Sequence, residues 1–313
     1  MKIIKLHHPI DPKRKFTGPV VLAMGFFDGL HLGHQKVIAT ARKIAQARHF
    51  PLAVLTYDHH PATIYRRLDR HDRRYLTLYH DKMRDFRQLG VQIVYLVNYT
   101  ASFQFQSPQQ FVDNYLVRLK AQTVVAGFNH TYGDSRVANM RTLPRYARGR
   151  MRVVTVPKVE VAGQKVSSTK IKRALDRGAI EAANQMLGRP FQTSGTVVRG
   201  YQRGRKLGFP TLNIATDDYQ WLPGEGVYVT RVKINHRFYP GMASIGRNAT
   251  FGNHYPITVE INLLNFSRNV YGEVVRVDWL KKLRNQVKFA NAQALIQQMK
   301  NDRAATQKYF QKL

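Results

Sequence analysis

The chain has 313 residues, carries 50 Lys and Arg against 19 Asp and Glu, and contains no cysteine. Its length accommodates two domains, and the lack of cysteine excludes disulfides, thiolate metal sites and cysteine nucleophiles. Because no apolar run approaches the roughly 20 residues that span a bilayer, and the segment Met1–His8 lacks the pattern of a signal peptide, we expect a cytoplasmic protein with no membrane partner.

The formal net charge of +31 at pH 7 attracts polyanions. Charge alone does not decide between nucleic acid, acidic lipid and phosphorylated small molecules. The basic residues are spread along the chain, although five arginines crowd residues 66–74. No basic tail and no aromatic-rich RNA-binding pattern accompany them, so a generally basic surface is favoured, and nucleic acid is not expected as the main partner.

The first half of the chain alternates strand and helix patterns. Continuous apolar runs typical of buried strands occupy residues 20–24, 52–57, 91–97, 123–127 and 151–156. Apolar residues at helical spacing follow the first run, and Ser107, Pro108 and Gln110 mark the start of a later helix with a capping box. Buried strands separated by helices predict a parallel sheet with helices on both faces, and such sheets bind ligands beyond the carboxyl ends of their strands.

The first predicted strand ends in a glycine-rich turn, Gly25–His34, that leads into a helix. Glycine allows a backbone to approach a ligand closely, and a helix N-terminus offers unpaired N–H groups to a phosphate. His31 and His34 lie at this helix start and add two donors. We interpret the turn as a site for a nucleoside triphosphate rather than as a turn with two solvated histidines.

The second half of the chain changes its pattern. The helical stretch Ala179–Leu187 ends at Gly188–Pro190, and we place the domain boundary there, giving domains 1–188 and 189–313. Strand patterns follow at residues 196–198, 227–234, 257–264 and 274–279, with few helices between them, before a final helix at about 290–313. This order predicts a small antiparallel β-barrel with a C-terminal helix.

A second dense motif, Gly200–Asn213, begins this half. It holds three glycines and three cations within nine residues, a composition suited to phosphate. Thr211 and Asn213 share one face of an extended segment, where two neutral oxygens can hold Mg²⁺. Glu260 stands in mid-strand and is either a solvent-facing carboxylate or the base that takes a proton from a substrate hydroxyl. A basic surface loop is the alternative interpretation of the motif.

These motifs resemble those of one enzyme family. The turn Gly25–His34 resembles the His-x-Gly-His nucleotidyltransferases, above all the amino-terminal half of the bacterial bifunctional riboflavin kinase/FAD synthetases. Ser167–Lys172 resembles that family's second triphosphate-binding segment, with Lys172 in place of its arginine. Gly200–Asn213 and Val259–Phe266 resemble the flavokinase domain. The resemblance implies an α/β nucleotidyltransferase domain with a parallel sheet, followed by a flavokinase β-barrel with a C-terminal helix.

The resemblance also implies the reactions and the residues that carry them. The barrel is expected to phosphorylate riboflavin with ATP to FMN, and the first domain to transfer AMP from ATP to FMN, giving FAD and pyrophosphate. The catalytic residues implied are His31, His34 and Glu260. Those implied to bind ATP for adenylyl transfer are Gly25, Phe26, Asp28, Gly29, Asn129, Ser167, Ser168, Thr169 and Lys172. Those implied to bind ATP in the kinase are Gly200, Arg205, Gly208, Pro210, Thr211 and Asn213, with Thr211 and Asn213 also binding Mg²⁺. Those implied to bind flavin are Tyr57, Asp58, Arg284 and Phe289.

Three departures from the family pattern keep alternatives open. The segment Ile245–Thr250 lacks a usual proline, Asn285–Gln286 stands where an acidic residue is common, and Asn262 replaces a common histidine. One alternative is therefore a monofunctional FMN adenylyltransferase whose barrel only binds flavin. Another, drawn from the charge, is a basic nucleic-acid-binding protein or a flavin-responsive regulator. The sequence leaves the oligomeric state undecided.

Overall fold

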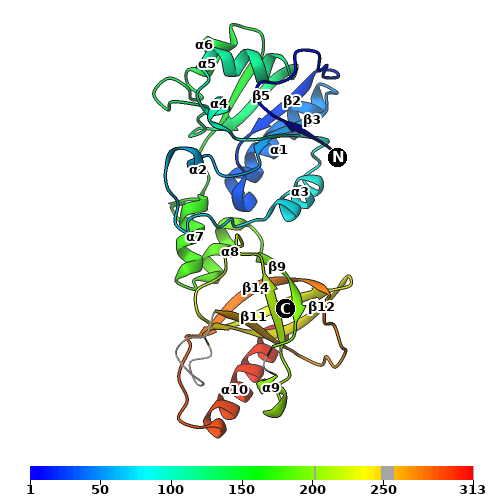
Figure 1. The fold of residues 1–313 in the computed structure, drawn as a ribbon, viewed down its shortest axis with the longest axis vertical. Coiled ribbons are helices and arrows are strands. Elements are labelled where there is room, and N and C mark those ends of the chain that lie inside the picture. Colours follow the sequence, from blue (N-terminus) through cyan, green and yellow to red (C-terminus); the bar gives the residue numbers. More distant parts are fainter. Residues whose placement is uncertain (201, 248–256, 313) are drawn as a thin grey trace. The chain divides into compact units, whose positions relative to one another are not determined.

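The computed structural model describes residues 1–200, 202–247 and 257–312. The chain forms two compact units, Met1–Ser167 and Ser168–Leu313 (Figure 1). None of the helices in the described part of the chain combines the length and the apolar content needed to cross a membrane. The two units are described in turn below.

The first unit is built on a six-stranded sheet with the order β1-β4-β3-β2-β5-β6. Its strands are β1 (Lys2–Leu6), β2 (Val20–Met24), β3 (Leu52–Tyr57), β4 (Ile93–Val97), β5 (Ala121–Gly127) and β6 (Arg152–Val156). All neighbours pair in parallel, which confirms the predicted sheet. Strand β1 was not predicted, because it lies at the edge, pairs only with β4 and buries only Leu6, so it lacks a continuous apolar run.

Helices cover both faces of this sheet. They are α1 (Leu32–Ala47), α2 (Ala62–Tyr65), α3 (Tyr79–Gln88), α4 (Ala101–Gln104), α5 (Pro108–Phe111) and α6 (Leu143–Ala147), with a 3₁₀ turn η1 (Asp28–Leu30) and a π-helix η2 (Val112–Val117). Apolar residues of α1 and α3 form one buried cluster with the sheet, and those of α5 and η2 form another. A two-stranded ribbon, β7 (Glu160–Val161) and β8 (Gln164–Lys165), follows the sheet.

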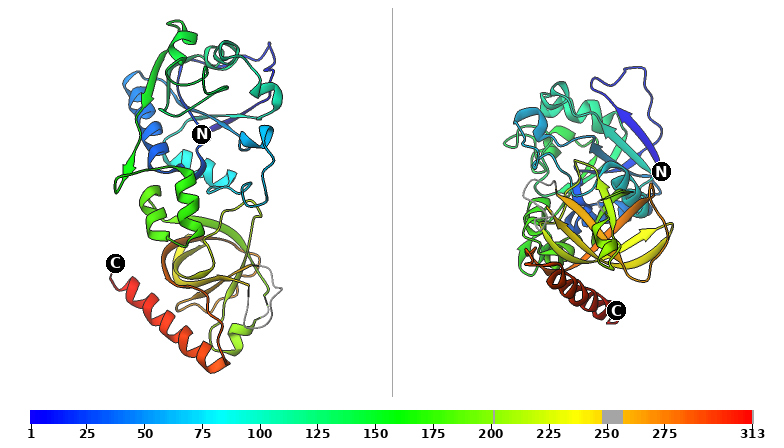
Figure 2. Two further views of the ribbon diagram at one scale, coloured as in Figure 1. Left: turned by 90° about the vertical axis from the view of Figure 1, so that its left-hand side faces the viewer. Right: turned by 60° about the horizontal axis from the view of Figure 1, so that its bottom comes forward.

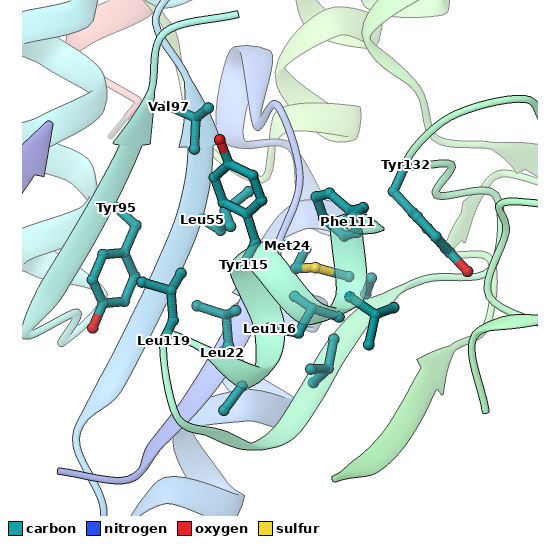
Figure 3. Packing of buried hydrophobic residues seen from close by; sticks show 14 of the residues in the cluster. Leu22, Met24, Leu55, Tyr95, Val97, Phe111, Tyr115, Leu116, Leu119 and Tyr132 are labelled. Atoms are coloured by element: carbon teal, nitrogen blue, oxygen red, sulfur yellow. The ribbon is translucent and has the colours of Figure 1, made fainter. Parts of the chain in front are cut away.

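The predicted capping box starts α5. The Ser107 hydroxyl accepts from the Gln110 N–H at 3.2 Å, and the Gln110 side chain accepts from the Ser107 N–H at 2.8 Å. Aromatic residues beyond the cap then pack on the sheet (Figure 3), where Phe111 and Tyr115 stack with ring centroids 5.6 Å apart. These buried aromatic side chains pack tightly on one face of the sheet, near the carboxyl ends of its strands.

The second unit opens with α7 (Ser168–Asp176) and α8 (Ile180–Leu187) and continues into a closed six-stranded barrel. The strands are β9 (Phe191–Val198), β10 (Leu212–Thr216), β11 (Gly226–Ile234), β12 (Arg237–Gly246), β13 (Thr258–Leu263) and β14 (Val274–Arg284). All barrel pairings are antiparallel, as predicted. Strand β12 was not predicted, because Pro240 and Gly241 interrupt its apolar pattern.

Two helices accompany the barrel, the short α9 (Arg203–Lys206) and the long α10 (Ala292–Phe310). Helix α10 lies beside the barrel in both views of Figure 2 and contacts β12 and β11. Helix α8 packs on β14 and β9, and the Asn184 side chain donates to the Trp279 carbonyl at 2.9 Å. By contacts, α7 and α8 therefore belong with the barrel. The domain boundary after residue 188 stays a prediction.

Two candidate active sites

The turn between β2 and α1 has an unusual backbone. Phe27 and Leu30 have φ values of +59° and +43°, and Gly29 has +82°. The left-handed region costs a non-glycine residue roughly 1–2 kcal/mol. Both Phe27 and Leu30 are 1% exposed, so the packing of their side chains holds this backbone in place. Such strain gathers at functional sites and here directs the chain into the start of α1.

The two histidines of this turn stack on one another. Their ring centroids are 3.6 Å apart with planes 15° from parallel. The His31 Nδ1 accepts from the His34 N–H at 3.3 Å and so caps α1, which leaves the proton of a neutral imidazole on Nε2. A Cβ on Gly33 would lie 3.1 Å from the His31 ring, so glycine makes room for this stack.

Burial keeps both imidazoles neutral. It lowers the pKa of His31 to about 4, because the side chain is shielded from water. It also lowers the pKa of His34 well below its ordinary value, with added contributions from His31 and Lys82. The His34 Nδ1 is buried and has no hydrogen-bond partner within the described residues. The pair can therefore donate to a phosphate as neutral groups, without acting as cations at pH 7.

Asp28 fastens the turn to the segment before α3. Its carboxylate is 5% exposed and accepts from the N–H groups of Leu76 and Thr77 at 2.9 and 3.2 Å. These charge-assisted bonds join segments that are far apart in sequence. Asp28 therefore orients the turn.

Lys82, which was not predicted from the sequence, contacts the same turn. Its Nζ donates to the Phe26 carbonyl at 3.3 Å and lies 4.5 Å from the centroid of the Phe26 ring. The side chain is 5% exposed, and burial lowers its pKa to about 8 against the opposing effect of Asp28 and Asp58. A usable signal was present, because Lys82 precedes Phe86 by four residues and so lies on the apolar stripe of α3.

The other predicted residues of the first unit occupy different surroundings. Tyr57 is 4% exposed and packs on Tyr99 and Phe103, so little of its surface is left for flavin, and burial raises its pKa. Asp58 accepts from the Tyr99 N–H at 3.0 Å and from the Asn98 side chain at 2.6 Å. Asn129 lies exposed in the loop after β5. Tyr57 ends β3, while Asp58 and Asn129 follow the carboxyl ends of β3 and β5, the edge at which a ligand was expected.

The predicted second phosphate segment falls at the division between the units. Ser167 ends the first unit, while Ser168, Thr169 and Lys172 begin α7 in the second. The Lys172 Nζ lies 4.5 Å from the ring centroid of Trp221, whose N–H donates to Asp176 at 3.0 Å. The convergence of this segment with the histidines stays a prediction.

A cavity of about 250 Å³ in the second unit brings several predicted residues together. Those that line it are Thr211, Asn213, Glu260, Arg284 and Phe289. Asn213 pairs with Glu260 across β10 and β13, so both side chains share one face. The Thr211 hydroxyl donates to one oxygen of Glu260 at 3.5 Å, and the Thr258 hydroxyl donates to the other at 3.5 Å.

Gly200 and Gly208 allow the backbone beside this cavity to take its course, the first by its small size and the second by its positive φ. A Cβ on Gly200 would lie 2.3 Å from the Asn213 side chain, so a larger residue there would displace that side chain. Gly208 has φ +82° and lets the chain turn towards Thr211. Arg205 and Pro210 are exposed in the same stretch.

Asn262 ties this stretch to β13. Its amide donates to the Pro210 carbonyl at 2.7 Å, directly before Thr211. The side chain is 5% exposed and lines the cavity, and its Oδ1 is buried with no partner in the described part of the chain. Asn262 is therefore a positioning residue, although the sequence analysis noted it only as a departure from the family pattern.

Arg284 joins the barrel to α10. Its guanidinium pairs with Asp302 at 2.8 Å and lies 5.6 Å from the centroid of the Phe289 ring. Gln286, one of the departures, donates to the Ser244 hydroxyl at 2.7 Å and to the Ile245 carbonyl at 3.0 Å, so it fits this wall. Residues 248–250 of the other departure lie outside the described residues.

Comparisons with known proteins match both halves of the chain. Residues 13–170 match the family described as FAD synthetase, and residues 187–310 match the family described as riboflavin kinase. A bifunctional riboflavin kinase/FMN adenylyltransferase of Listeria monocytogenes is 44% identical over 313 residues, covering 100% of this chain and 99% of that protein. The protein of the same name from Bacillus subtilis is 36% identical over 315 residues, covering 100% of this chain and 99% of the relative.

A solved structure also shares the fold. A crystal structure named as a macrolide-efflux protein from Streptococcus pneumoniae matches with a TM-score of 0.89 and 32% identity, covering 98% of this chain and 99% of that chain. The alternatives of a monofunctional enzyme and of a nucleic-acid-binding regulator are not favoured by these matches. The chain belongs to the family of bifunctional riboflavin kinase/FMN adenylyltransferases, with an FAD synthetase part followed by a riboflavin kinase part.

Proposed function

We propose that this bifunctional enzyme runs its two reactions at two separate sites, one at the histidine turn and one at the barrel cavity. The observation that supports this most is the difference between the two groups of side chains. Stacked, neutral imidazoles lie at a helix start in the first unit, and a carboxylate flanked by hydroxyls faces a cavity in the second. The first group offers donors and the second offers a base.

FMN adenylylation is assigned to the turn between β2 and α1. An oxygen of the FMN phosphate attacks the α-phosphorus of ATP, the bond to the β-phosphate breaks, and pyrophosphate leaves. The nucleophile is already ionised, so the residues need only align the reactants and stabilise charge. His31 Nε2–H, His34 and the N–H groups at the start of α1 are proposed to donate to the phosphate oxygens.

Riboflavin phosphorylation is assigned to the cavity beside Glu260. The 5′-hydroxyl of riboflavin attacks the γ-phosphorus of ATP and ADP leaves, while Glu260 takes the hydroxyl proton. Thr211 and Thr258 hold the two carboxylate oxygens and so orient the base. Arg284 and Phe289 are proposed to contact the flavin from the same cavity, since both line it.

Mg²⁺ is proposed to accompany ATP at Thr211 and Asn213. The Thr211 and Asn213 side chains fit this ion, since both offer neutral oxygens beside the Glu260 carboxylate. Mg²⁺ typically binds through one or two protein oxygens plus phosphates and water. When bound, it would neutralise charge on the phosphates.

Further residues are proposed to bind the substrates of adenylyl transfer. Ser167, Ser168, Thr169 and Lys172 are proposed to hold the triphosphate, Asn129 to lie near the adenine, and Tyr57 and Asp58 to lie near FMN. A domain boundary at residue 188 and a cytoplasmic location likewise remain predictions.

Product analysis with single variants tests the assignment. His31→Ala should lose FAD formation from FMN and ATP by about 100-fold or more while keeping riboflavin phosphorylation, and Glu260→Gln should do the reverse. FMN and FAD are separated chromatographically, and thermal unfolding confirms that each variant is folded. Loss of both activities in either folded variant would contradict two separate sites.

A further inference from the structure

Lys82 carries a buried ammonium group that has no role in either of the two reactions as proposed above. Its side chain is 5% exposed near the start of α3, between the apolar core and the turn that carries the histidines. Removing a charged ammonium from water is costly unless an opposite charge compensates it. A lysine kept at this position therefore needs a reason.

The bonds of Lys82 compensate the charge only in part. Of three donor hydrogens, one goes to the Phe26 carbonyl at 3.3 Å, which also accepts from the Thr56 hydroxyl at 3.1 Å. The Phe26 ring adds a cation–π contact at 4.5 Å. No ion pair joins Lys82 to a carboxylate anywhere in the described part of the chain. The ammonium is thus close to the turn and short of negative charge.

Charged and titratable groups face Lys82 from several elements. Asp28 comes from η1 and Asp58 from the end of β3, and both favour the charged form. His34 comes from α1 and is kept neutral partly by Lys82, while the His60 ring packs edge-on against Phe26 at 5.0 Å between ring centroids. Because the pKa of Lys82 is lowered to about 8 by burial, its charge is retained at pH 7 and lost in mildly alkaline solution.

We propose that Lys82 is a positioning residue of adenylyl transfer, whose buried charge fixes the Phe26 carbonyl and is completed by the phosphates that bind at this turn. This inference rests on the proposed location of adenylyl transfer at His31 and His34. The anion supplies the missing negative charge, so binding and charge development in the reaction are favoured by a cation that is already in place. Lys82 acts through the turn, without contacting the reacting atoms.

If Lys82 only stabilised the fold, its replacement should lower Tm. The lowered pKa indicates instead that its charge lowers the free energy of unfolding. The folded-state pKa of about 8 lies below the ordinary value of 10.5, so the unfolded chain binds this proton more tightly. The free energy of unfolding therefore rises with pH between about 8 and 10.5, which means that the charged lysine lowers stability at pH 7. Replacement by an apolar side chain of similar shape should not lower Tm.

The test compares Lys82→Met with Lys43→Met, an exposed lysine of α1, in the full chain. For each variant, kcat and KM of FMN adenylylation are measured from about pH 6 to pH 10, together with riboflavin phosphorylation and Tm. We expect Lys82→Met to lower kcat/KM of adenylylation about tenfold or more, to keep phosphorylation and Tm, and to lose the fall in activity that the wild type shows above about pH 8. Lys43→Met should match the wild type.

Two results would overturn the role of Lys82. One is wild-type adenylylation in Lys82→Met, and the other is a lower Tm that accounts for the loss of activity. The location of the reaction is tested independently by His31→Ala. If His31→Ala keeps FAD formation, the site itself is wrong, whereas if only Lys82→Met keeps it, the site stands and the role of Lys82 falls.

Discussion

The two proposed sites would bind the same co-substrate in different surroundings. At the turn before α1, the polar groups Asp28, His31 and Lys82 are each 5–6% exposed, and the imidazoles are neutral. In the barrel, Glu260 and Thr211 are partly exposed and face a cavity of about 250 Å³. The difference follows from the nucleophiles. An FMN phosphate arrives ionised and needs only donors, whereas an alcohol must give up a proton to a base.

The largest effect should come from the glycines that make room at each site. A Cβ at Gly200 would lie 2.3 Å from the Asn213 side chain, whereas one at Gly33 would lie 3.1 Å from the His31 ring. We expect Gly200→Ala to lower kcat/KM of phosphorylation about 100-fold, because it displaces a proposed ligand, and Gly33→Ala to lower adenylylation about tenfold. Separate assays of the two products measure both. A Gly200→Ala enzyme with full kinase activity would show that Asn213 is not needed where it lies.

Acid should lower the free energy of unfolding through the protonation of His31. Its folded-state pKa of about 4 lies below the ordinary 6.5, so the unfolded chain binds more protons between these values and stability falls as the pH drops through that window. The loss from this group should reach about 2 kcal/mol between pH 7 and pH 5. Urea unfolding of the wild type and His31→Gln at both pH values measures it, with the exposed His49→Gln as control. Equal acid sensitivity of His31→Gln and wild type would argue against a buried, neutral His31.

A smaller effect is expected at Asn262, beside the cavity. Asn262→Ala removes the 2.7 Å bond to the Pro210 carbonyl and should lower kcat/KM of phosphorylation about tenfold, with adenylylation unchanged. Asn262→His keeps a donor and should retain more activity than the alanine variant. Kinase kinetics over a range of Mg²⁺–ATP concentrations distinguish the two. If alanine and histidine behave alike, the donated bond does not position Thr211.

The regular parts of the fold were predictable from local pattern. Strands β2 and β3 are fully buried and therefore show continuous apolar runs, and the capping box before α5 has a fixed spacing. The edge strand β1 escaped because it buries one residue of five. The alternation of Thr211 and Asn213 predicted their shared face, because a strand repeats every two residues.

The site details that escaped depend on contacts between distant segments. The hydrogen bond from Lys82 to the Phe26 carbonyl joins segments that are far apart in sequence, and so does the bond from Asn262 to the Pro210 carbonyl. Neither partner can be predicted from local pattern. The strain at Phe27 and Leu30 has no local signature either, since it is held by their burial in the core. The sequence pattern therefore identified both motifs, whereas the burial and the charged neighbours of their side chains could be read only from the three-dimensional structure.

The ion pair between Arg284 and Asp302 has a consequence for how the enzyme matures. Leu295, Met299 and Asp302 of α10 form part of the wall of the kinase cavity, whereas every residue proposed for adenylyl transfer lies before residue 173. A ribosome extends the chain from the amino terminus, and units formed early fold first. The nascent polypeptide should therefore acquire the means to bind FMN and ATP well before it can make FMN itself.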